Sequence, residues 1–231
     1  MMRRHGALAA IAAVLLGAQL AHAETLNQLT DAEKSAGWQL LFDGSSKTGW
    51  RNYNKPDASD KWVIEDGALK SEKGAGDLIT EGQYDYYELS LECISPSGGN
   101  AGIIYRCAEP KGPPYVTGPE IQVIGDMNPK SKNSAGSCYD MYAPTKDVLK
   151  PNGQWNSVRL VIKPDNQVEH WMNGEKICEY TIGSDDWNQR VASSKWAKTA
   201  GYGKTVKGHI CLQDHGAVVS FRNIKIRQLK P

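Results

Sequence analysis

Hydrophobic and polar positions alternate with a period of two over much of this chain. The alternating segments are rich in β-branched and aromatic residues and are bounded by Gly, Pro, Asn or Asp, which is typical of half-buried β-strands. The clearest of them are 86–94, 101–107, 120–124, 155–163 and 218–229. Helical patterns are scarce: Thr30 and Glu33 fit a capping box that opens one short helix before Gly37, and 184–198 is expected to hold another short piece. The pattern therefore predicts an all-β protein with little helix.

Turn signals divide these strands into neighbouring antiparallel pairs. Asp66-Gly67 and Asn173-Gly174 each tolerate the positive φ angles of a type I′ hairpin turn. The second turn, together with Pro164–Asn166, makes 155–180 a three-stranded meander. Many short strands, long Gly/Pro loops and no long linker predict one domain over residues 24–231. The size of the domain and its long loops favour a jelly-roll sandwich of two antiparallel sheets over an immunoglobulin-like domain.

The first 23 residues have the three parts of a secretory signal peptide. Arg3 and Arg4 form the positive region, 7–16 form a short apolar stretch, and Ala21-His22-Ala23 supplies a small-residue cleavage site. The apolar stretch is shorter than the roughly 20 residues that a membrane-spanning helix needs. We therefore expect a mature protein from about Glu24 that is periplasmic or secreted and has no membrane span.

Charge and cysteine content narrow the functional classes. The chain has 27 Lys and Arg and 26 Asp and Glu, so removal of residues 1–23 with Arg3 and Arg4 leaves a net charge of −1. Such a chain lacks the basic surface of a nucleic-acid-binding protein. Its five cysteines show no C-x-x-C spacing, allow at most two disulfides, and mostly lie in apolar runs where they would act as small buried hydrophobic residues.

Candidate chemistry lies on the polar faces of three predicted strands. Residues at i and i+2 of a strand project from the same face of the sheet. The polar residues that share such a face, or end such a strand, are Glu120 with Gln122, Arg106, and His209, Cys211, Gln213 and His215. A carboxylate, an arginine, two amides and a histidine suit a polyhydroxylated ligand, and tryptophans could supply surfaces on which sugar rings stack.

Each of these side chains also has a purely structural interpretation. His215 would cap a turn, Arg106 would be an ion-pair partner, and Glu120 would be an exposed acid at the start of a strand. Glu88 and Glu92 do not form a glycosidase pair, because four residues of strand separate them by roughly 13 Å. A retaining glycosidase needs its two carboxyl groups about 5 Å apart.

Ten motifs in order carry a resemblance to a known family. They are GWQLLFDGSSKTGW (37–50), WVIEDGALKSE (62–72), GDLITEGQYDYYELSLE (76–92), GGNAGIIYR (98–106), GPEIQVIGD (118–126), GSCYDMYAP (136–144), NGQWN (152–156), HWMNG (170–174), GHICLQDHG (208–216) and VSFRNIKIRQL (219–229). With them the chain resembles the 3-keto-disaccharide hydrolases over nearly all of its mature length. The resemblance implies a concanavalin-like, lectin-like jelly roll. This chain departs from the family at Ala101, where a Ser is usual, and at Gly125, where an acid is usual.

The resemblance also implies the cleavage of glycosides that a separate oxidoreductase has already oxidised to a ketone at C3. The ketone acidifies the C2 hydrogen, so a base can remove it, the C1 substituent leaves by β-elimination, and water adds to the enone. Such a route needs one base and a group that stabilises the enolate oxygen.

On this basis we expect His215 or Glu120 to be the base and Arg106 to hold the keto oxygen. The expected sugar-binding residues are Gln122, Asp126, Tyr139, His170 and Gln213. A divalent cation held by carboxylate and imidazole groups is an alternative to Arg106, and we expect all these groups to meet in one hollow. Two other functions remain open: a non-catalytic carbohydrate-binding lectin, and an ordinary glycosidase, which needs two facing carboxylates.

Overall fold

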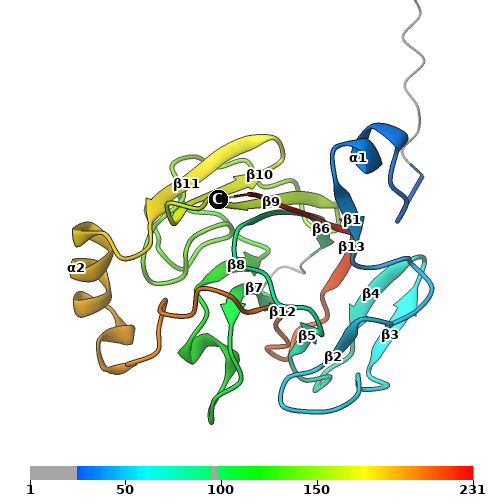
Figure 1. The fold of residues 1–231 in the computed structure, drawn as a ribbon, viewed down its shortest axis with the longest axis horizontal. Coiled ribbons are helices and arrows are strands. Elements are labelled where there is room, and N and C mark those ends of the chain that lie inside the picture. Colours follow the sequence, from blue (N-terminus) through cyan, green and yellow to red (C-terminus); the bar gives the residue numbers. More distant parts are fainter. Residues whose placement is uncertain (1–24, 95–97, 231) are drawn as a thin grey trace, which may run out of the picture.

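Two antiparallel sheets packed face to face form the protein, confirming the predicted sandwich (Figure 1). The computed structural model describes residues 25–94 and 98–230, so the predicted signal peptide of residues 1–23 lies outside the described residues. No helix within these two ranges is long and apolar enough to cross a membrane.

The larger sheet has eight strands in the order β11-β10-β9-β6-β13-β4-β3, with β1 paired to β13. Its strands are β1 (Trp38–Leu40), β3 (Trp62–Glu65), β4 (Ala68–Ser71), β6 (Tyr87–Ile94), β9 (Asn156–Ile162), β10 (Gln167–Met172), β11 (Glu175–Thr181) and β13 (Ser220–Gln228). Positive φ angles at Asp66 (50°), Gly67 (71°), Asn173 (50°) and Gly174 (84°) confirm the two predicted hairpin turns.

The smaller sheet has five strands in the order β2-β5-β12-β7-β8. These are β2 (Trp50–Asn52), β5 (Leu78–Thr80), β7 (Asn100–Cys107), β8 (Glu120–Ile124) and β12 (His209–Leu212). Alternation along the strands gives the sheet two unlike faces. The inner face packs on the larger sheet with Ala101, Ile103, Tyr105, Ile121, Val123, Ile210 and Leu212, all of which belong to the main hydrophobic core. The outer face carries the polar alternates, so it is the face on which a site can form.

Helix is confined to four short pieces among the described residues. These are α1 (Asp31–Ser35), η1 (Pro114–Val116), α2 (Asp185–Ser193) and η2 (Lys195–Lys198). The predicted capping box is present at α1, where Thr30 and Glu33 exchange side-chain-to-backbone hydrogen bonds. The expected helical content of 184–198 is confirmed as α2 followed by η2.

A column of aromatic rings holds α2 and η2 against the sandwich. Trp196 stacks on Tyr202 with ring centroids 4.6 Å apart, and Tyr202 stacks on Trp187 at 5.7 Å. Trp187 stacks in turn on Tyr180 at 5.6 Å, and Tyr180 on Tyr142 at 4.5 Å. Each such pair contributes about 0.5–1.5 kcal/mol beyond the area it buries, so this column fixes the segment that carries Trp196.

All five cysteines are free and buried, in agreement with their interpretation as small hydrophobic residues. Burial raises the pKa of the thiols of Cys93, Cys107 and Cys138 to about 12 and that of Cys178 to about 11, so these thiols stay protonated.

Candidate active site

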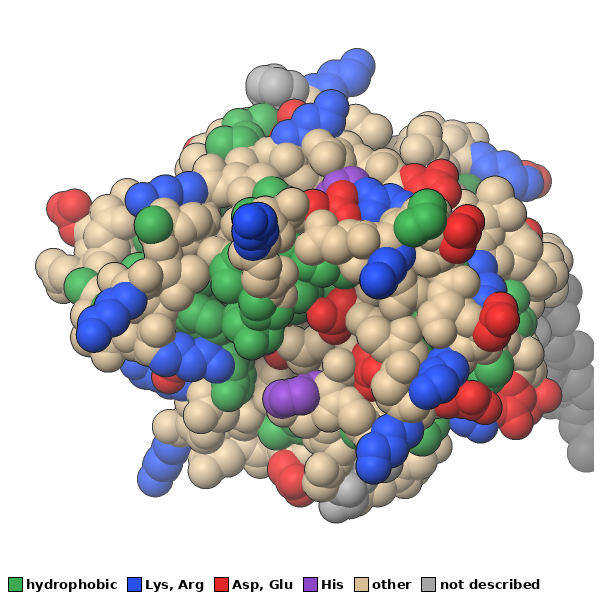
Figure 2. Space-filling view, turned by 90° about the horizontal axis from the view of Figure 1, so that it is seen from below, with side chains coloured by type: hydrophobic (Ala, Val, Ile, Leu, Met, Phe, Trp, Pro, Cys, Tyr) green, Lys and Arg blue, Asp and Glu red, His purple; other side chains and the backbone are tan. Residues whose placement is uncertain are grey.

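A pocket opens at one end of the outer face of the five-stranded sheet. Its empty space is about 390 Å³, and its lining residues are Asn100, Tyr115, Glu120, Gln122, Tyr139, Lys195, Trp196, Gln213 and His215. We refer to it as the Glu120 pocket. Figure 2 views the molecule from the side of this sheet and shows hydrophobic side chains gathered in a hollow, with carboxylates and a histidine beside it. The pocket brings together five of the eight residues that the sequence singled out.

Glu120 occupies the floor of the pocket because a glycine on the neighbouring strand leaves room for it. Gly102 of β7 pairs with Gln122 of β8, and Ile104 of β7 pairs with Glu120. A Cβ on Gly102 would lie only 2.3 Å from Oε1 of Glu120. The carboxyl group therefore lies flat over Gly102, and the residue is only 4% exposed.

Burial makes this carboxyl group an unusual acid. Loss of hydration is the largest effect and raises the pKa of Glu120 to about 8, with Asp77 adding to the rise and Lys195 opposing it. Among the described residues, no side chain or backbone group donates a hydrogen bond to the Glu120 carboxyl group. Glu120 can therefore exchange a proton near neutral pH and is open to a ligand.

Two amide oxygens of the pocket also lack partners among the described residues. They are Oε1 of Gln122 and Oε1 of Gln213, both buried. A buried acceptor without a hydrogen bond costs about 1–3 kcal/mol, a cost that a hydroxyl group of a ligand would remove. The pocket is therefore suited to a ligand rich in hydroxyl groups.

A short chain of hydrogen bonds orients His215. Nε2 of Gln122 donates to Oδ1 of Asn100 at 3.2 Å, which turns Nδ2 of Asn100 toward Nδ1 of His215. Because an amide nitrogen can only donate, Nδ1 of the neutral imidazole accepts and its proton resides on Nε2. His215 then presents an N–H donor to the pocket.

Three aromatic side chains and a lysine form another part of the pocket lining. Tyr115 and Tyr139 lie against Trp196, with ring centroids 5.8 and 6.5 Å from the indole. Nζ of Lys195 lies 3.8 Å from the Tyr139 ring centroid and 4.4 Å from that of Trp196. Since the Lys195 charge also acts on Glu120, the lysine is the cation of this pocket.

Arg106 does not join this pocket, contrary to expectation. Strand β7 pairs with β12 through Ile104–Cys211 and Cys107–His209. Between these two pairs β7 carries one residue more than β12, and Arg106 adopts a φ of 51° at this bulge. Its guanidinium group turns to the carbonyl of Asp85 (3.3 and 3.4 Å) and to Oδ1 of Asn166 (2.9 Å), which lies in the turn between two strands of the other sheet. Arg106 therefore ties the two sheets together.

His170 and Asp126 are also absent from the pocket. His170 is fully buried between the sheets, where Nδ1 donates to the carbonyl of Gly136 (3.0 Å) and Nε2 accepts from the Tyr180 hydroxyl (2.8 Å). Burial lowers its pKa to about 4, so the imidazole is a neutral core group. Asp126 is exposed beyond the end of β8. The predicted sugar-binding role of both residues therefore has no support in their positions.

Three residues that line the pocket were not identified from the sequence, and a fourth, Trp196, was considered there only among the tryptophans that could stack on a sugar. Asn100, Tyr115, Lys195 and Trp196 come from a strand start, η1 and η2. Asn100 alone carried a usable signal, because it occupies the same strand face as Gly102 next to a Gly-rich turn. The other three lie in segments without strand periodicity.

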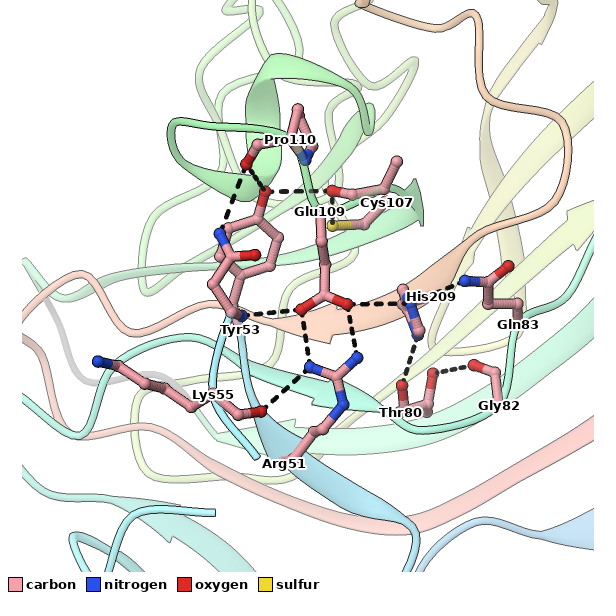
Figure 3. A network of polar contacts seen from close by, with 12 residues as sticks. Arg51, Tyr53, Lys55, Thr80, Gly82, Gln83, Cys107, Glu109, Pro110 and His209 are labelled. Carbon is pink, nitrogen blue, oxygen red and sulfur yellow. Dashed lines mark hydrogen bonds and ion pairs between the residues drawn. The ribbon is translucent and has the colours of Figure 1, made fainter. Parts of the chain in front are cut away.

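A second polar cluster lies at the opposite end of the same sheet face (Figure 3). Arg51 forms a bidentate ion pair with Glu109, with N–O distances of 2.7 and 2.5 Å. Nδ1 of His209 donates to the carbonyl of Thr80 (2.7 Å), and its Nε2 lies 3.5 Å from Glu109 and accepts from the amide of Gln83 (3.0 Å). We call this set the Arg51 network. The hydrogen bonds that Glu109 accepts from Arg51 are the main reason that the pKa of Glu109 is lowered to about 2.

Within residues 25–94 and 98–230, no three His, Cys, Asp or Glu side chains lie together in a way that could hold a metal ion. The divalent cation considered from the sequence stays a prediction, and the chemistry derived for the Glu120 pocket is that of its protein groups.

Comparison with known proteins identifies close relatives of this chain. Residues 37–227 match the 3-keto-alpha-glucoside-1,2-lyase-like domain. A 3-keto-disaccharide hydrolase of Bacteroides thetaiotaomicron is 30% identical over 90% of this chain and 83% of that protein. A candidate glycosyl hydrolase of Parabacteroides distasonis, solved at 1.70 Å, is 37% identical with a TM-score of 0.84 and covers 89% of this chain and 100% of that one. A second from the same organism is 28% identical with a TM-score of 0.63, over 83% and 99%.

Proposed function

The chain belongs to the 3-keto-alpha-glucoside-1,2-lyase-like family, and from this membership and the Glu120 pocket we propose that it cleaves 3-keto-glycosides by removing the proton at C2. The observation that carries the proposal is a buried carboxyl group with a raised pKa beside two unpartnered amide oxygens. The carboxyl group is suited to taking a proton from carbon, and the amide oxygens are suited to accepting hydrogen bonds from sugar hydroxyl groups.

Glu120 is the base in this proposal. A carboxylate whose conjugate acid has a pKa of about 8 is a far stronger base than an ordinary carboxylate, and it still ionises near neutral pH. It takes the C2 proton, and the electron pair of the C–H bond becomes the enolate of the C3 ketone. This assignment decides between Glu120 and His215, the two bases that the sequence left open.

Lys195 takes the part that the sequence analysis gave to Arg106. Its ammonium group lies at the rim of the same pocket, where it can stabilise the negative charge that develops on the keto oxygen. Gln122, Gln213 and Tyr139 hold the sugar hydroxyl groups. As the C1–O bond breaks, the departing oxygen takes its proton from a water molecule held by the Nε2–H of His215. The hydroxide left from that water adds to C1 of the enone and Glu120 returns its proton to C2, which gives net hydrolysis.

The proposal also covers the location of the protein and the enzyme that supplies its substrate. The signal-like N-terminus supports a secreted or periplasmic protein. Because its substrate already carries a C3 ketone, a separate sugar 3-oxidoreductase must supply that substrate.

The experiment is incubation with 3-keto-trehalose and with methyl 3-keto-α-glucoside, followed by identification of the products. Wild type should consume both, whereas Glu120→Gln and His215→Ala should each lower turnover by at least about tenfold. Glu72→Gln, a change at an exposed acid outside the pocket, is the matched control. If both pocket variants keep more than a tenth of the wild-type turnover, the assigned roles are wrong.

Two further arms separate the alternative functions. Binding of unoxidised trehalose without consumption of any 3-keto-glycoside would indicate a lectin, and release of glucose from unoxidised trehalose would indicate an ordinary glycosidase. A parallel assay with a chelator tests the divalent cation considered from the sequence.

A further inference from the structure

A second hollow lies beside the Glu120 pocket, and we propose that it binds the leaving group of the glycoside, a second sugar or a similarly hydroxylated group. The proposal rests on the proposed function and extends it. The hollow is an open depression whose empty space, part of it open solvent, is about 1190 Å³, and it is lined by the segments 52–53, 55–60 and 75–77. We call it the Asp77 hollow.

Both depressions lie at the same end of the five-stranded sheet. The Glu120 pocket includes the start of β7 and the residues that follow β12, whereas the Asp77 hollow includes the end of β2 and the residues that precede β5. Because β5 pairs directly with β12, these two groups of strand ends are neighbours. Adjacent strands lie about 4.8 Å apart, so a ligand that crosses a few strands would reach from one depression into the other.

The turn that carries His215 separates the two depressions. On one side of this turn, Oδ2 of Asp214 accepts from the backbone N–H of Gly76 (2.8 Å), and Oδ1 of Asp77 accepts from the backbone N–H of Asp214 (3.0 Å). On the other side, Nδ1 of His215 contacts Asn100 inside the Glu120 pocket. A bond that lies across this turn would have its two halves in different depressions and His215 beside it.

Asp77, in the lining of the hollow, also interacts electrostatically with Glu120 and His215. Asp77 is largely buried, which raises the pKa of its carboxyl group to about 6, while the hydrogen bond from the backbone N–H of Asp214 opposes the rise, as would a positive charge on His215. The charge of Asp77 also contributes to the raised pKa of Glu120. A group bound beside Asp77 therefore lies within the electrostatic reach of both residues to which the proposed function assigns a part in proton transfer.

The lining of the Asp77 hollow indicates the class of its occupant. Lys55, Asp57 and Asp60 are exposed and Ser59 is half-buried, so donors and acceptors surround the opening. The aromatic surface here is limited to Tyr53, whose hydroxyl group is already bonded to the carbonyl of Ala108 (3.1 Å). Such a lining favours a polar, hydroxylated leaving group over an aromatic one.

Obstruction of the hollow should change the preference between substrates. Asp57→Trp and Asp60→Trp each place a large side chain at the opening, at positions where the native side chain is exposed. We expect the ratio of kcat/KM for 3-keto-trehalose to kcat/KM for methyl 3-keto-α-glucoside to fall about tenfold in at least one of them. Glu72→Trp, at an exposed acid that lines neither depression, should leave the ratio within about twofold of wild type.

The outcomes separate this inference from the function on which it rests. If wild type cleaves both substrates and neither tryptophan variant changes the ratio by more than about twofold, the Asp77 hollow is not the leaving-group subsite and the proposed function stands. If wild type cleaves neither substrate, the proposed function fails and this inference fails with it. A fall in the ratio confined to the hollow variants supports the assignment, since a general loss of folded protein would lower both rate constants together.

Discussion

The outer face of the five-stranded sheet carries two polar clusters, one at each end, and they differ in how their hydrogen bonds are completed. In the Arg51 network every charged group faces an opposite charge or a donor of the protein, and Glu109 is held ionised by Arg51. In the Glu120 pocket the carboxyl group has no donor among the described residues, and two amide oxygens are equally without partners.

This difference shows how one sheet face can serve both stability and function. A satisfied network lowers the free energy of the folded state and leaves nothing for a ligand to bind. An unsatisfied cluster raises that free energy, and it persists because the rest of the sandwich is stable enough to hold it. The residue types alone do not reveal the distinction, since each cluster contains a Glu, a His and a basic residue.

The largest expected effect comes from the unsatisfied cluster. Glu120→Gln should lower kcat on a 3-keto-glycoside by roughly 10²–10⁴-fold, because an amide cannot take up the C2 proton. The variant should unfold at the same urea concentration as wild type or at a higher one, since it replaces a buried titratable group by a neutral one. A marked loss of stability in this variant would contradict the comparison.

The next effect concerns the glycine that makes room for this carboxyl group. Gly102→Ala would place a Cβ 2.3 Å from Oε1 of Glu120, so the carboxyl group must move. We expect kcat to fall about tenfold or more, because a displacement of even 1 Å can cost about 10² in rate. The double variant Gly102→Ala/Glu120→Gln should be no slower than Glu120→Gln alone. Additive losses would show that the glycine acts in some other way.

The Arg51 network should respond in the opposite manner. Glu109→Gln leaves Arg51 without its counter-ion, and we expect a loss of about 1–3 kcal/mol in the free energy of unfolding, measured with urea. Turnover per folded molecule should stay within about threefold of wild type. A loss of turnover comparable to that of Glu120→Gln would mean that the network belongs to the site.

The smallest effect is that the two clusters make stability depend on pH with opposite signs. The native protein keeps a proton on Glu120 up to a pKa of about 8, whereas the unfolded chain releases it near the ordinary glutamate pKa of 4.5. Stability from this group therefore falls as pH rises from about 4.5 to about 8. Glu109, with a pKa of about 2, contributes stability above 4.5 that is lost as pH falls toward 2. The free energy of unfolding, measured with urea across this pH range, should therefore change in two ways. In Glu120→Gln it should no longer fall as pH rises toward about 8, and in Glu109→Gln it should no longer fall as pH drops toward about 2.

Sequence periodicity was sufficient for the fold and for the floor of the site. Strands with one buried face leave a two-residue pattern, and turns that need positive φ leave Asn-Gly and Asp-Gly, so the sandwich and its hairpins could be predicted. The same alternation placed Glu120 with Gln122 and Gln213 with His215 on one face. The resemblance to a family supplied the chemistry that these residues could serve.

The side-chain direction of Arg106 could not be predicted from strand alternation. Alternation places it on the same face as Gly102 and Ile104, but the bulge at its left-handed backbone reverses the direction of its side chain. Nothing in the local sequence marks this bulge. Lys195 was missed, and Trp196 could not be singled out among the tryptophans, for a related reason: their segment reaches the pocket only because the folded chain packs it there through contacts between distant residues. His170 was misplaced because its two hydrogen-bond partners, Gly136 and Tyr180, are defined only by the tertiary structure.

The column of stacked rings that begins at Trp196 gives this protein a natural optical reporter. Trp196 forms part of the wall where a sugar would bind, and its indole is stacked on Tyr202 and, through it, on Trp187. Tryptophan emission depends on the polarity and mobility of the surroundings. Displacement of water from this wall by a ligand should therefore change the fluorescence of the unlabelled enzyme, so that occupancy can be followed without any chemical turnover.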